Sequence, residues 1–384
     1  MRTVRVTHAG GAYDVRIGAG VLETLPDRVA ELAPRSNRVV TVHDRGAPAE
    51  PLLAASARLN ATHQLSAIPF DPSERDKSLA KYGEIQRRLA AESVERTDVL
   101  VAYGGGVTGD LGGFAAATYR RGMALIQCPT TLLSMVDASV GGKTGVNLAL
   151  GDADDAPLLK NMVGAFYQPL EVLADVSVLS SLDERTFRSG LGECVKHGLI
   201  AGAWDDAGLL DWTRANADAI LARDTDTLEE LVTRNVAVKA RVVAADEREL
   251  ATGRSGRQLL NLGHTFAHAF EPVPGLGPDG GLLTHGEAVA LGTLAASRCA
   301  AALGRVEPDH QKTLKELLTR FGLPTTLPPS ADAPALVARM HDDKKAVGGQ
   351  LRVVLPTGDA TAEVTNAPSD DRLAATIRML VESR

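Results

Sequence analysis

The sequence predicts an α/β domain over residues 1–180, followed by an all-helical domain over residues 181–384. Its 384 residues suit about two domains, at roughly 100–200 residues each. In the first half, short apolar strand patterns alternate with helical patterns, which is typical of a mostly parallel sheet covered on both faces. From Asp183 onward, long helical patterns dominate, so we place the boundary near residues 178–183.

The first half supplies the elements of the predicted sheet. In chain order we expect a hairpin, then strands and helices in alternation: Val4–Thr7 with Tyr13–Ile17, strand Arg38–Val42, helix Ser78–Ala91, strand Val99–Tyr103, helix Gly109–Tyr119 and strand Ala124–Gln127. The acidic stretch Asp152–Leu159 contains a proline and predicts an exposed loop.

The second half predicts helices almost throughout. Their apolar residues recur at helical spacing over the following ranges: Glu184–Ile200, Ala207–Ala217, Asp226–Asp246, Leu259–Glu271, Glu287–Leu303 and Asp309–Phe321. One strand is expected near the end, at Leu351–Leu355.

Composition excludes several classes of protein. Apolar residues make up 44% and charged residues 23%, which is ordinary for a folded globular protein. The net charge of −7 argues against a nucleic-acid or membrane-surface protein, which would show a basic block. No apolar run reaches the roughly 20 residues of a membrane span, and the N-terminus lacks a signal-peptide core. The cysteines are odd in number and scattered, which predicts a reducing cytoplasm without disulfides: Cys128, Cys194 and Cys299.

A glycine-rich turn, Gly104-Gly105-Gly106, follows the apolar strand at residues 99–103 and precedes a predicted helix. Such a turn lets backbone N–H groups approach a phosphate, and the helix N-terminus favours negative charge. The turn does not fit GxGxxG, so both nucleotide binding and a tight strand–helix connection remain open.

A second glycine-rich segment, GGKTG at residues 141–145, is similar to part of a P-loop. The P-loop would need glycine at position 137, where this sequence has Asp137, so we reject an NTPase. Lys143 still suits an anionic ligand, although a lone lysine is more often a solvated charge.

A third group of residues has the chemistry of a zinc site. Glu193 lies in GECVKHG, His264 and His268 lie in NLGHTFAHAFE, and His285 lies in LLTHGE. Zinc is commonly held by imidazole nitrogens and a carboxylate. His264 and His268 share a helix face, so each could be a ligand or a histidine satisfied within the fold. A zinc deaminase is excluded because no PCxxC follows, and a serine hydrolase because GxSxG is absent.

Taken together, these segments resemble the 3-dehydroquinate synthase family of the sugar-phosphate cyclase superfamily. The matching stretches occur in the family order and cover most of the chain: residues 104–122, 129–147, 160–169, 192–200, 239–249, 257–271, 285–292 and 342–345. The resemblance implies a Rossmann-like nucleotide-binding domain followed by a helical metal-binding domain, with NAD⁺ and Zn²⁺ or Co²⁺ in the cleft between them. It also implies a homodimer.

The implied reaction converts 3-deoxy-D-arabino-heptulosonate 7-phosphate to 3-dehydroquinate and phosphate. This is a lyase step of the shikimate pathway, which leads to the aromatic amino acids, and NAD⁺ would be regenerated in each turnover. Zinc would acidify a ring hydroxyl for oxidation, and the resulting ketone would acidify the neighbouring C–H so that phosphate can leave. The cofactor supplies the redox chemistry, and the protein supplies orientation and electrostatics.

The resemblance also assigns roles to residues. The implied metal ligands are Glu193, His264 and His285. The implied NAD⁺ site consists of Asp44, Glu74, Lys77, Gly104, Gly105, Gly106, Asp110, Thr130, Thr131 and Lys160. Substrate would be bound by Asp137, Lys143, Lys196, Lys239, Arg257, Asn261, His268 and Lys345. The implied catalytic groups are Glu249, His268, Lys143, Asn161 and Arg121.

The sequence departs from the family pattern in three places. Eight extra residues, Asp152–Leu159, precede Lys160 and Asn161. The spacing from Glu249 to Arg257 is a little long, and Ala267 replaces a common glycine between the two histidines of NLGHTFAHAFE. The alternatives are a cyclase of sedoheptulose 7-phosphate, glucose 6-phosphate or an amino analogue, a metal-dependent polyol dehydrogenase, and an inactive binding protein. Lys239 and Arg257 stand where the synthases face a substrate carboxylate, so we favour the carboxylated substrate.

Overall fold

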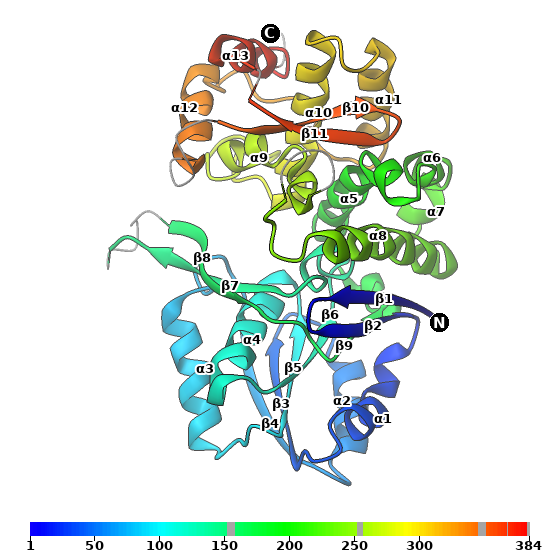
Figure 1. Cartoon of the computed structure of the whole chain (residues 1–384), viewed down its shortest axis with the longest axis vertical. Coiled ribbons are helices and arrows are strands. Elements are labelled where there is room, and N and C mark those ends of the chain that lie inside the picture. Colours follow the sequence, from blue (N-terminus) through cyan, green and yellow to red (C-terminus); the bar gives the residue numbers. More distant parts are fainter. Residues whose placement is uncertain (152–157, 252–255, 345–350, 367, 382–384) are drawn as a thin grey trace. The chain divides into compact units, whose positions relative to one another are not determined.

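The computed structural model describes residues 1–151, 158–251, 256–344, 351–366 and 368–381 (Figure 1). The chain divides into two compact units. The first comprises Met1–Leu182 and Leu228–Ala240, and the second comprises Asp183–Thr227 and Arg241–Arg384. The predicted single boundary near residue 180 agrees with the end of the first segment at Leu182. It does not account for Leu228–Ala240, which belongs to the first unit although it follows that boundary.

A seven-stranded sheet forms the centre of the first unit, in the order β1-β2-β9-β6-β5-β3-β4. The strands are β1 (Arg2–His8), β2 (Gly11–Gly18), β3 (Arg38–Asp44), β4 (Gln64–Phe70), β5 (Val99–Gly104), β6 (Ala124–Pro129) and β9 (Glu171–Asp175). β1 pairs antiparallel with β2, and the other pairings are parallel. The predicted α/β class and hairpin are confirmed.

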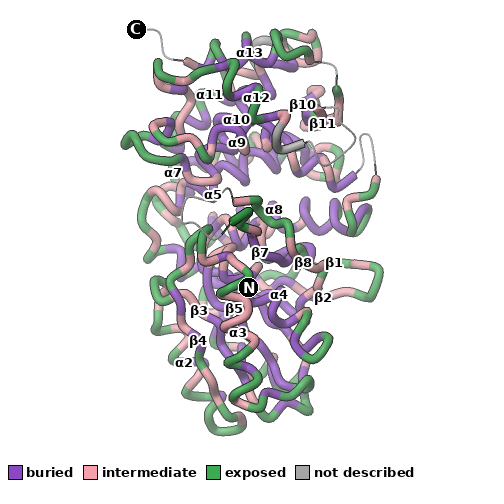
Figure 2. The backbone as a smooth tube through the Cα atoms, turned by 90° about the vertical axis from the view of Figure 1, so that its left-hand side faces the viewer, coloured by how far each residue is buried: buried purple, intermediate pink, exposed green. Residues whose placement is uncertain are grey.

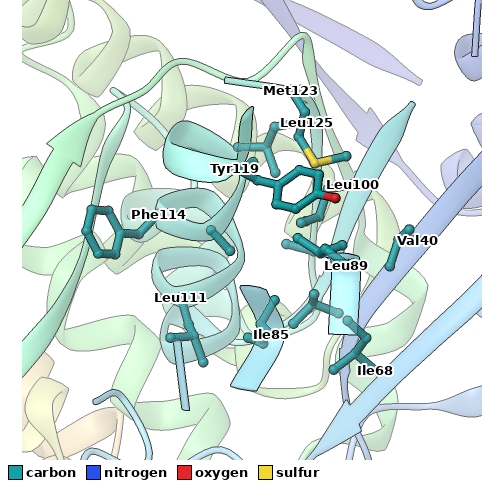
Figure 3. Close-up of a cluster of buried hydrophobic side chains, with 14 of the residues drawn as sticks. Val40, Ile68, Ile85, Leu89, Leu100, Leu111, Phe114, Tyr119, Met123 and Leu125 are labelled. Atoms are coloured by element: carbon teal, nitrogen blue, oxygen red, sulfur yellow. The ribbon is translucent and has the colours of Figure 1, made fainter. Parts of the chain in front are cut away.

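Helices cover both faces of this sheet, with α1 (Leu25–Leu32) and α2 (Ala49–Leu59) on one side and α3 (Leu79–Ala91) and α4 (Gly106–Thr118) on the other (Figure 1). Between the sheet and the second pair lies a hydrophobic core (Figure 3). Ile85 and Leu89 of α3 are four residues apart, so they point to the same side and meet Leu100 of β5 and Leu111 of α4 there.

A separate antiparallel pair joins β7 (Lys143–Ala149) to β8 (Leu158–Phe166). The loop expected at Asp152–Leu159 therefore ends earlier than predicted, since Leu158 and Leu159 pair with Ala149 and Leu148. Residues 152–157 lie outside the described part of the chain, and the exposed excursion expected there remains a prediction.

The second unit is built mainly of helices. They are α5 (Glu184–Gly198), α6 (Leu209–Ala215), α7 (Ala217–Leu221), α9 (His264–Phe270), α10 (His285–Ala302), α11 (Pro308–Arg320), α12 (Ala333–Lys344) and α13 (Asp370–Arg378), and α8 (Thr225–Ala245) carries the segment that packs with the first unit. A hairpin of β10 (Val353–Gly358) and β11 (Thr361–Thr365) adds strands to this unit, the first of which the sequence predicted.

Helix α10 is the central element of the second unit. Its residues Gly286–Ser297 are all buried, because the segment is apolar or small nearly all round. Figure 2 shows the buried residues concentrated in the interior of each unit. The helix starts with a capping box, in which Thr284 Oγ1 accepts from the Glu287 N–H and Glu287 Oε2 accepts from the Thr284 N–H. Among the described residues, no helix has the length and apolarity that crossing a membrane requires.

Candidate active site

Three helices of the second unit bring Glu193, His264 and His285 together. Glu193 lies inside α5, and the two histidines are the first residues of α9 and α10. The Nε2 atoms of His264 and His285 lie 3.6 Å and 3.4 Å from Glu193 Oε1. One ligand atom from each residue can be chosen so that all three lie within 4.8 Å of one another. A carboxylate with two imidazoles is a donor set that suits Zn²⁺, so the residues fit the implied metal.

Close contacts between the helix backbones explain how these side chains meet. A Cβ added at Gly192 would lie 2.4 Å from Gly286 O, and one at Gly286 would lie 1.7 Å from Ser189 O. Only glycine permits α5 and α10 to approach so closely. Because Glu193 follows Gly192 and His285 precedes Gly286, this crossing places both side chains at the metal cluster.

Acceptors on the far side of each imidazole orient the rings. His264 Nδ1 lies 3.3 Å from the carbonyl oxygen of Leu262, and His285 Nδ1 lies 3.6 Å from Glu271 Oε2. An Nδ1–H directed at such an acceptor leaves the Nε2 lone pair for a metal. Both Nε2 atoms face Glu193, so a neutral imidazole that carries its proton on Nδ1 would present its Nε2 lone pair to a metal beside that carboxylate.

The two histidines differ in their electrostatics. Burial lowers the pKa of His264 to about 3, and the nearby Lys196 ammonium adds to the effect. Burial also acts against the charged form of His285, but hydrogen bonds to Glu193 and Glu271 outweigh it and raise its pKa to about 9. Lys196, which is 1% exposed, forms an ion pair with Glu193. The predicted metal-binding and substrate-binding residues on α5 are thus in direct contact.

His268 is not part of the three-residue cluster, and its role in facing the substrate remains a prediction. Its ring centroid is 5.6 Å from that of His264, one helical turn earlier on α9. Asn261 Nδ2 donates to Glu249 Oε1 at 2.8 Å, so two further predicted site residues of this unit meet. Lys345 lies outside the described residues, and its role remains a prediction.

The first unit places the predicted nucleotide residues at the carboxyl ends of parallel strands. Asp44 ends β3, Gly104 ends β5, and Thr130 follows β6 and donates its N–H to Gly104 O at 2.9 Å. The chain passes from β3 outward to β4 and returns to β5 on the other side of β3. This is a topological switch point, where open α/β sheets bind their ligands.

The glycine-rich turn leads directly into α4, which starts at Gly106 rather than at the predicted Gly109. A Cβ at Gly104 would lie 2.5 Å from Thr108 Oγ1, and one at Gly105 would lie 3.2 Å from the Thr131 methyl group. Thr108 Oγ1 is buried and has no hydrogen-bond partner among the described residues. A turn without side chains before a helix N-terminus fits a dinucleotide phosphate.

A polar network connects four more of the predicted residues. Lys77 Nζ donates to Asp110 Oδ2 and to Asn161 Oδ1, both at 2.5 Å. Asn147 donates to Glu74 Oε2 at 2.9 Å and accepts from the Asn161 N–H at 2.9 Å. Burial raises the pKa of Asp110, and the Lys77 ammonium acts against that shift. The extra residues before Lys160 thus still leave Asn161 beside Lys77.

Lys239 and Asp137, both predicted to bind substrate, also form a pair. Lys239 Nζ lies 2.7 Å from Asp137 Oδ1 and also donates to the Asp137 carbonyl oxygen. Lys239 is 5% exposed, so its ammonium has a charged partner in a nearly dry setting. The carboxylate holds this lysine in one position.

Three further basic residues of the first unit were predicted to bind cofactor or substrate. Lys143 begins β7, Lys160 lies on β8, and both are exposed. Arg121 is exposed beyond the far end of α4, with a φ of 65°. Because α4 has 13 residues, its length of about 20 Å separates Arg121 from the glycine-rich turn. The structure therefore does not bring Arg121 to the predicted cofactor residues of its own unit.

Comparisons with known proteins show which family the chain belongs to. Residues 67–189 match the 3-dehydroquinate synthase N-terminal family, and residues 190–346 match the 3-dehydroquinate synthase C-terminal family. The chain belongs to the 3-dehydroquinate synthase family. The 3-dehydroquinate synthase of Caulobacter vibrioides is 43% identical over 97% of both chains. That of Jannaschia sp. is 42% identical over 96% of both chains.

Solved structures show the same fold. A 2-deoxy-scyllo-inosose synthase complexed with carbaglucose-6-phosphate, NAD⁺ and Co²⁺ is 25% identical to this member of the synthase family. The likeness has a TM-score of 0.83 and covers 98% of this chain and 100% of that one. The fold predicted from the sequence is thus the fold of a sugar-phosphate cyclase.

Sequence reasoning missed three residues that support the site. Asn147 closes the GGKTGVN motif, Asp246 opens DERE, and Glu271 ends NLGHTFAHAFE. Each is a polar residue within a segment that resembles the synthase family, and this position was the signal in the sequence that could have marked it as a site residue. Their hydrogen-bond partners became visible only in the fold.

Proposed function

We infer that this chain is a 3-dehydroquinate synthase, which converts 3-deoxy-D-arabino-heptulosonate 7-phosphate to 3-dehydroquinate and phosphate. The observation that carries the inference is the meeting of Glu193, His264 and His285 in a member of the synthase family. Family membership alone would not separate an active enzyme from a degenerate copy. A chain that had lost its chemistry would have no reason to keep a buried carboxylate facing two oriented imidazoles.

Two bound groups complete the proposed enzyme, and their residues come from different units. Glu193, His264 and His285 would hold a divalent metal, zinc or cobalt. Asp44, the glycine-rich turn and Thr130 would hold NAD⁺ at the switch point of the sheet. When bound, NAD⁺ accepts and returns a hydride while the metal acidifies the sugar hydroxyl.

The chain's own residues would bind and orient the substrate. Arg257 is 2% exposed and Lys239 is 5% exposed, so both charged groups are mostly desolvated. A buried cation of this kind interacts strongly with an anionic group of a ligand. We assign them to the carboxylate, and Lys196 and Lys143 to the other polar groups and the phosphate. Glu249, which accepts a hydrogen bond from Asn261, would take part in proton transfer.

The rival substrates lack the carboxylate that these cations would bind. A sedoheptulose or glucose phosphate offers no carboxylate to Arg257 and Lys239, so the favourable interaction of a carboxylate with these two buried cations would be lost. The 2-deoxy-scyllo-inosose synthase complexed with carbaglucose-6-phosphate is 25% identical to this chain, whereas the two 3-dehydroquinate synthases are 42–43% identical. The carboxylated heptulosonate is therefore the favoured substrate.

One assay tests the proposal. Purified protein loaded with Zn²⁺ is given the heptulosonate phosphate and a catalytic amount of NAD⁺, and phosphate release and dehydroquinate are followed. We expect many turnovers per NAD⁺ without accumulation of NADH. Accumulating NADH would indicate a polyol dehydrogenase, and faster turnover of sedoheptulose 7-phosphate would indicate another cyclase.

The proposal extends to the assembly and the location of the enzyme. We propose a homodimer in the cytoplasm, as the family resemblance and the odd, scattered cysteines imply. Light scattering on the eluted protein should give twice the chain mass of 40.3 kDa. A mass equal to one chain at micromolar concentration would contradict the dimer.

A further inference from the structure

Asp246 lies just beyond the C-terminus of α8 and is 8% exposed. Its carboxylate accepts three backbone hydrogen bonds. Oδ1 accepts from the Leu250 N–H at 2.8 Å, and Oδ2 accepts from the N–H groups of Ala251 at 3.2 Å and Arg257 at 2.9 Å. One side chain therefore fixes both the start of the segment after Glu249 and the backbone of Arg257.

The residues fixed in this way are two to which the proposed function gives roles. Glu249 immediately precedes Leu250 and has a φ of 58°, a left-handed conformation that non-glycine residues adopt only when their surroundings hold them there. Its side chain reaches Asn261. Arg257 is 2% exposed, and its Nη1 donates to Glu247 O at 2.7 Å. The Arg257 guanidinium is thus held by the Glu247 carbonyl oxygen, and the Arg257 backbone N–H is held by Asp246.

We propose that Asp246 is a positioning residue that sets the places of Glu249 and Arg257 for the reaction, an inference that rests on the proposed function. These residues lie outside regular strands, so no sheet ladder satisfies the N–H groups that Asp246 binds. A carboxylate suits the task because it offers two oxygens and no donor. An asparagine has one oxygen, and its NH₂ group would face an N–H that it cannot satisfy.

A matched control lies in the first unit. Asp98 is 3% exposed, and its carboxylate also accepts three backbone N–H groups. They belong to Asn37 and Arg38 at 3.0 Å each and Glu95 at 2.7 Å. Asp98 precedes β5, at the opposite end of that strand from the glycine-rich turn. It therefore binds backbone N–H groups as Asp246 does, but none of those groups belongs to a residue assigned to the site.

The test compares Asp246→Asn with Asp98→Asn in the zinc-loaded enzyme. For Asp246→Asn we expect kcat/KM to fall roughly 100-fold, because a displacement of about 1 Å at a reacting group has an effect of that size. The loss should divide between a higher KM, from Arg257, and a lower kcat, from Glu249, with zinc content and NAD⁺ affinity unchanged. For Asp98→Asn, KM and kcat per folded molecule should match the wild type.

Other results would overturn the proposal. If Asp246→Asn only lowers the active fraction, with KM unchanged as in Asp98→Asn, then Asp246 is structural. If the variant does not fold, amide hydrogen exchange in the wild type decides the matter. The Leu250 and Arg257 amides should exchange as slowly as the Arg38 amide held by Asp98, and exchange at the rate of an unbonded amide would refute the contact. If the wild type has no synthase activity but these amides exchange slowly, the proposed function is refuted, whereas the hydrogen bonds of Asp246 are confirmed.

Discussion

Gly286→Ala should weaken metal binding without altering any ligand. The glycine lies on α10 between His285 and Glu287, where the helix crosses α5. A methyl group there would meet the backbone of Ser189 on α5, and a Cβ added at Gly192, one turn further along α5 and next to Glu193, would lie 2.4 Å from Gly286 O. The substitution would therefore change the separation of two ligands whose own chemistry is intact.

The size of the effect follows from the overlap. The new Cβ would lie 1.7 Å from Ser189 O, half of the 3.4 Å at which ordinary contact begins. Neither partner is the flexible end of a side chain, so a helix has to move. Overpacking of this kind destabilises a protein by about 1–3 kcal/mol. Metal–ligand distances tolerate only about 0.2 Å, so the ion should lose either Glu193 or His285 as a ligand.

Two measurements and one control test this reasoning. Urea unfolding of the metal-free protein reports the packing cost, and competition with a chelator of known affinity reports zinc binding. Gly281→Ala is the control, because no described atom lies within 4 Å of a Cβ added there. A Gly286→Ala protein with wild-type stability and wild-type zinc affinity would refute the proposed role of the helix crossing.

Three further substitutions test other contacts. Glu271→Gln should lower zinc affinity by about 10–100-fold, because the carboxylate that orients His285 is lost; an unchanged affinity in the chelator competition would contradict that role. Arg257→Ala should reduce kcat/KM for the heptulosonate phosphate by about 10²–10³, the effect of removing one member of a buried ion pair, while zinc content stays constant; equal losses on a substrate without the carboxylate would argue against the assignment. Glu287→Gln should destabilise the protein at pH 7 by roughly 1–3 kcal/mol, because burial raises the pKa of Glu287 but the Arg185 guanidinium and the Thr284 N–H outweigh it and hold that pKa below its usual range. Since a depressed pKa stabilises the fold only above the unfolded value, wild type and variant should converge as pH falls through the folded pKa; a gap that persists in acid would contradict the sign.

The sheet was predictable where its strands consist mainly of apolar residues. β5 is buried throughout, and β3 and β6 are largely buried, with Thr41 and Gln127 as buried polar exceptions. β9 escaped prediction because it begins with Glu171, which is 1% exposed. Arg16 and Arg28 donate to that carboxylate at 2.7 Å each, from positions more than 140 residues away in sequence. Periodicity cannot show such a pairing.

The predicted helix boundaries are wrong where the backbone changes conformation but the spacing of apolar residues does not change. The helix predicted at Leu259–Glu271 consists of a 3-10 turn, Arg257–Asn261, and the separate helix α9. Gly263 divides them, with a φ of 77° that an α-helix does not allow. The helix predicted at Ala207–Ala217 ends as α6 at Ala215, and after Asn216 a separate helix, α7, continues to Leu221 beyond the predicted range.

The ligand types in the metal cluster were readable from the sequence, but the reason they converge was not. Each ligand has a glycine as a direct neighbour: Gly192 before Glu193, Gly263 before His264, and Gly286 after His285. A Cβ at Gly263 would lie 2.6 Å from the backbone nitrogen of Thr293 on α10, so this glycine also marks a close approach of backbones. Side chains as short as glutamate and histidine can reach one ion from three helices only if those helices approach closely. In the sequence alone these glycines look like weak points in helices, and only their partners show that they set the geometry of the site.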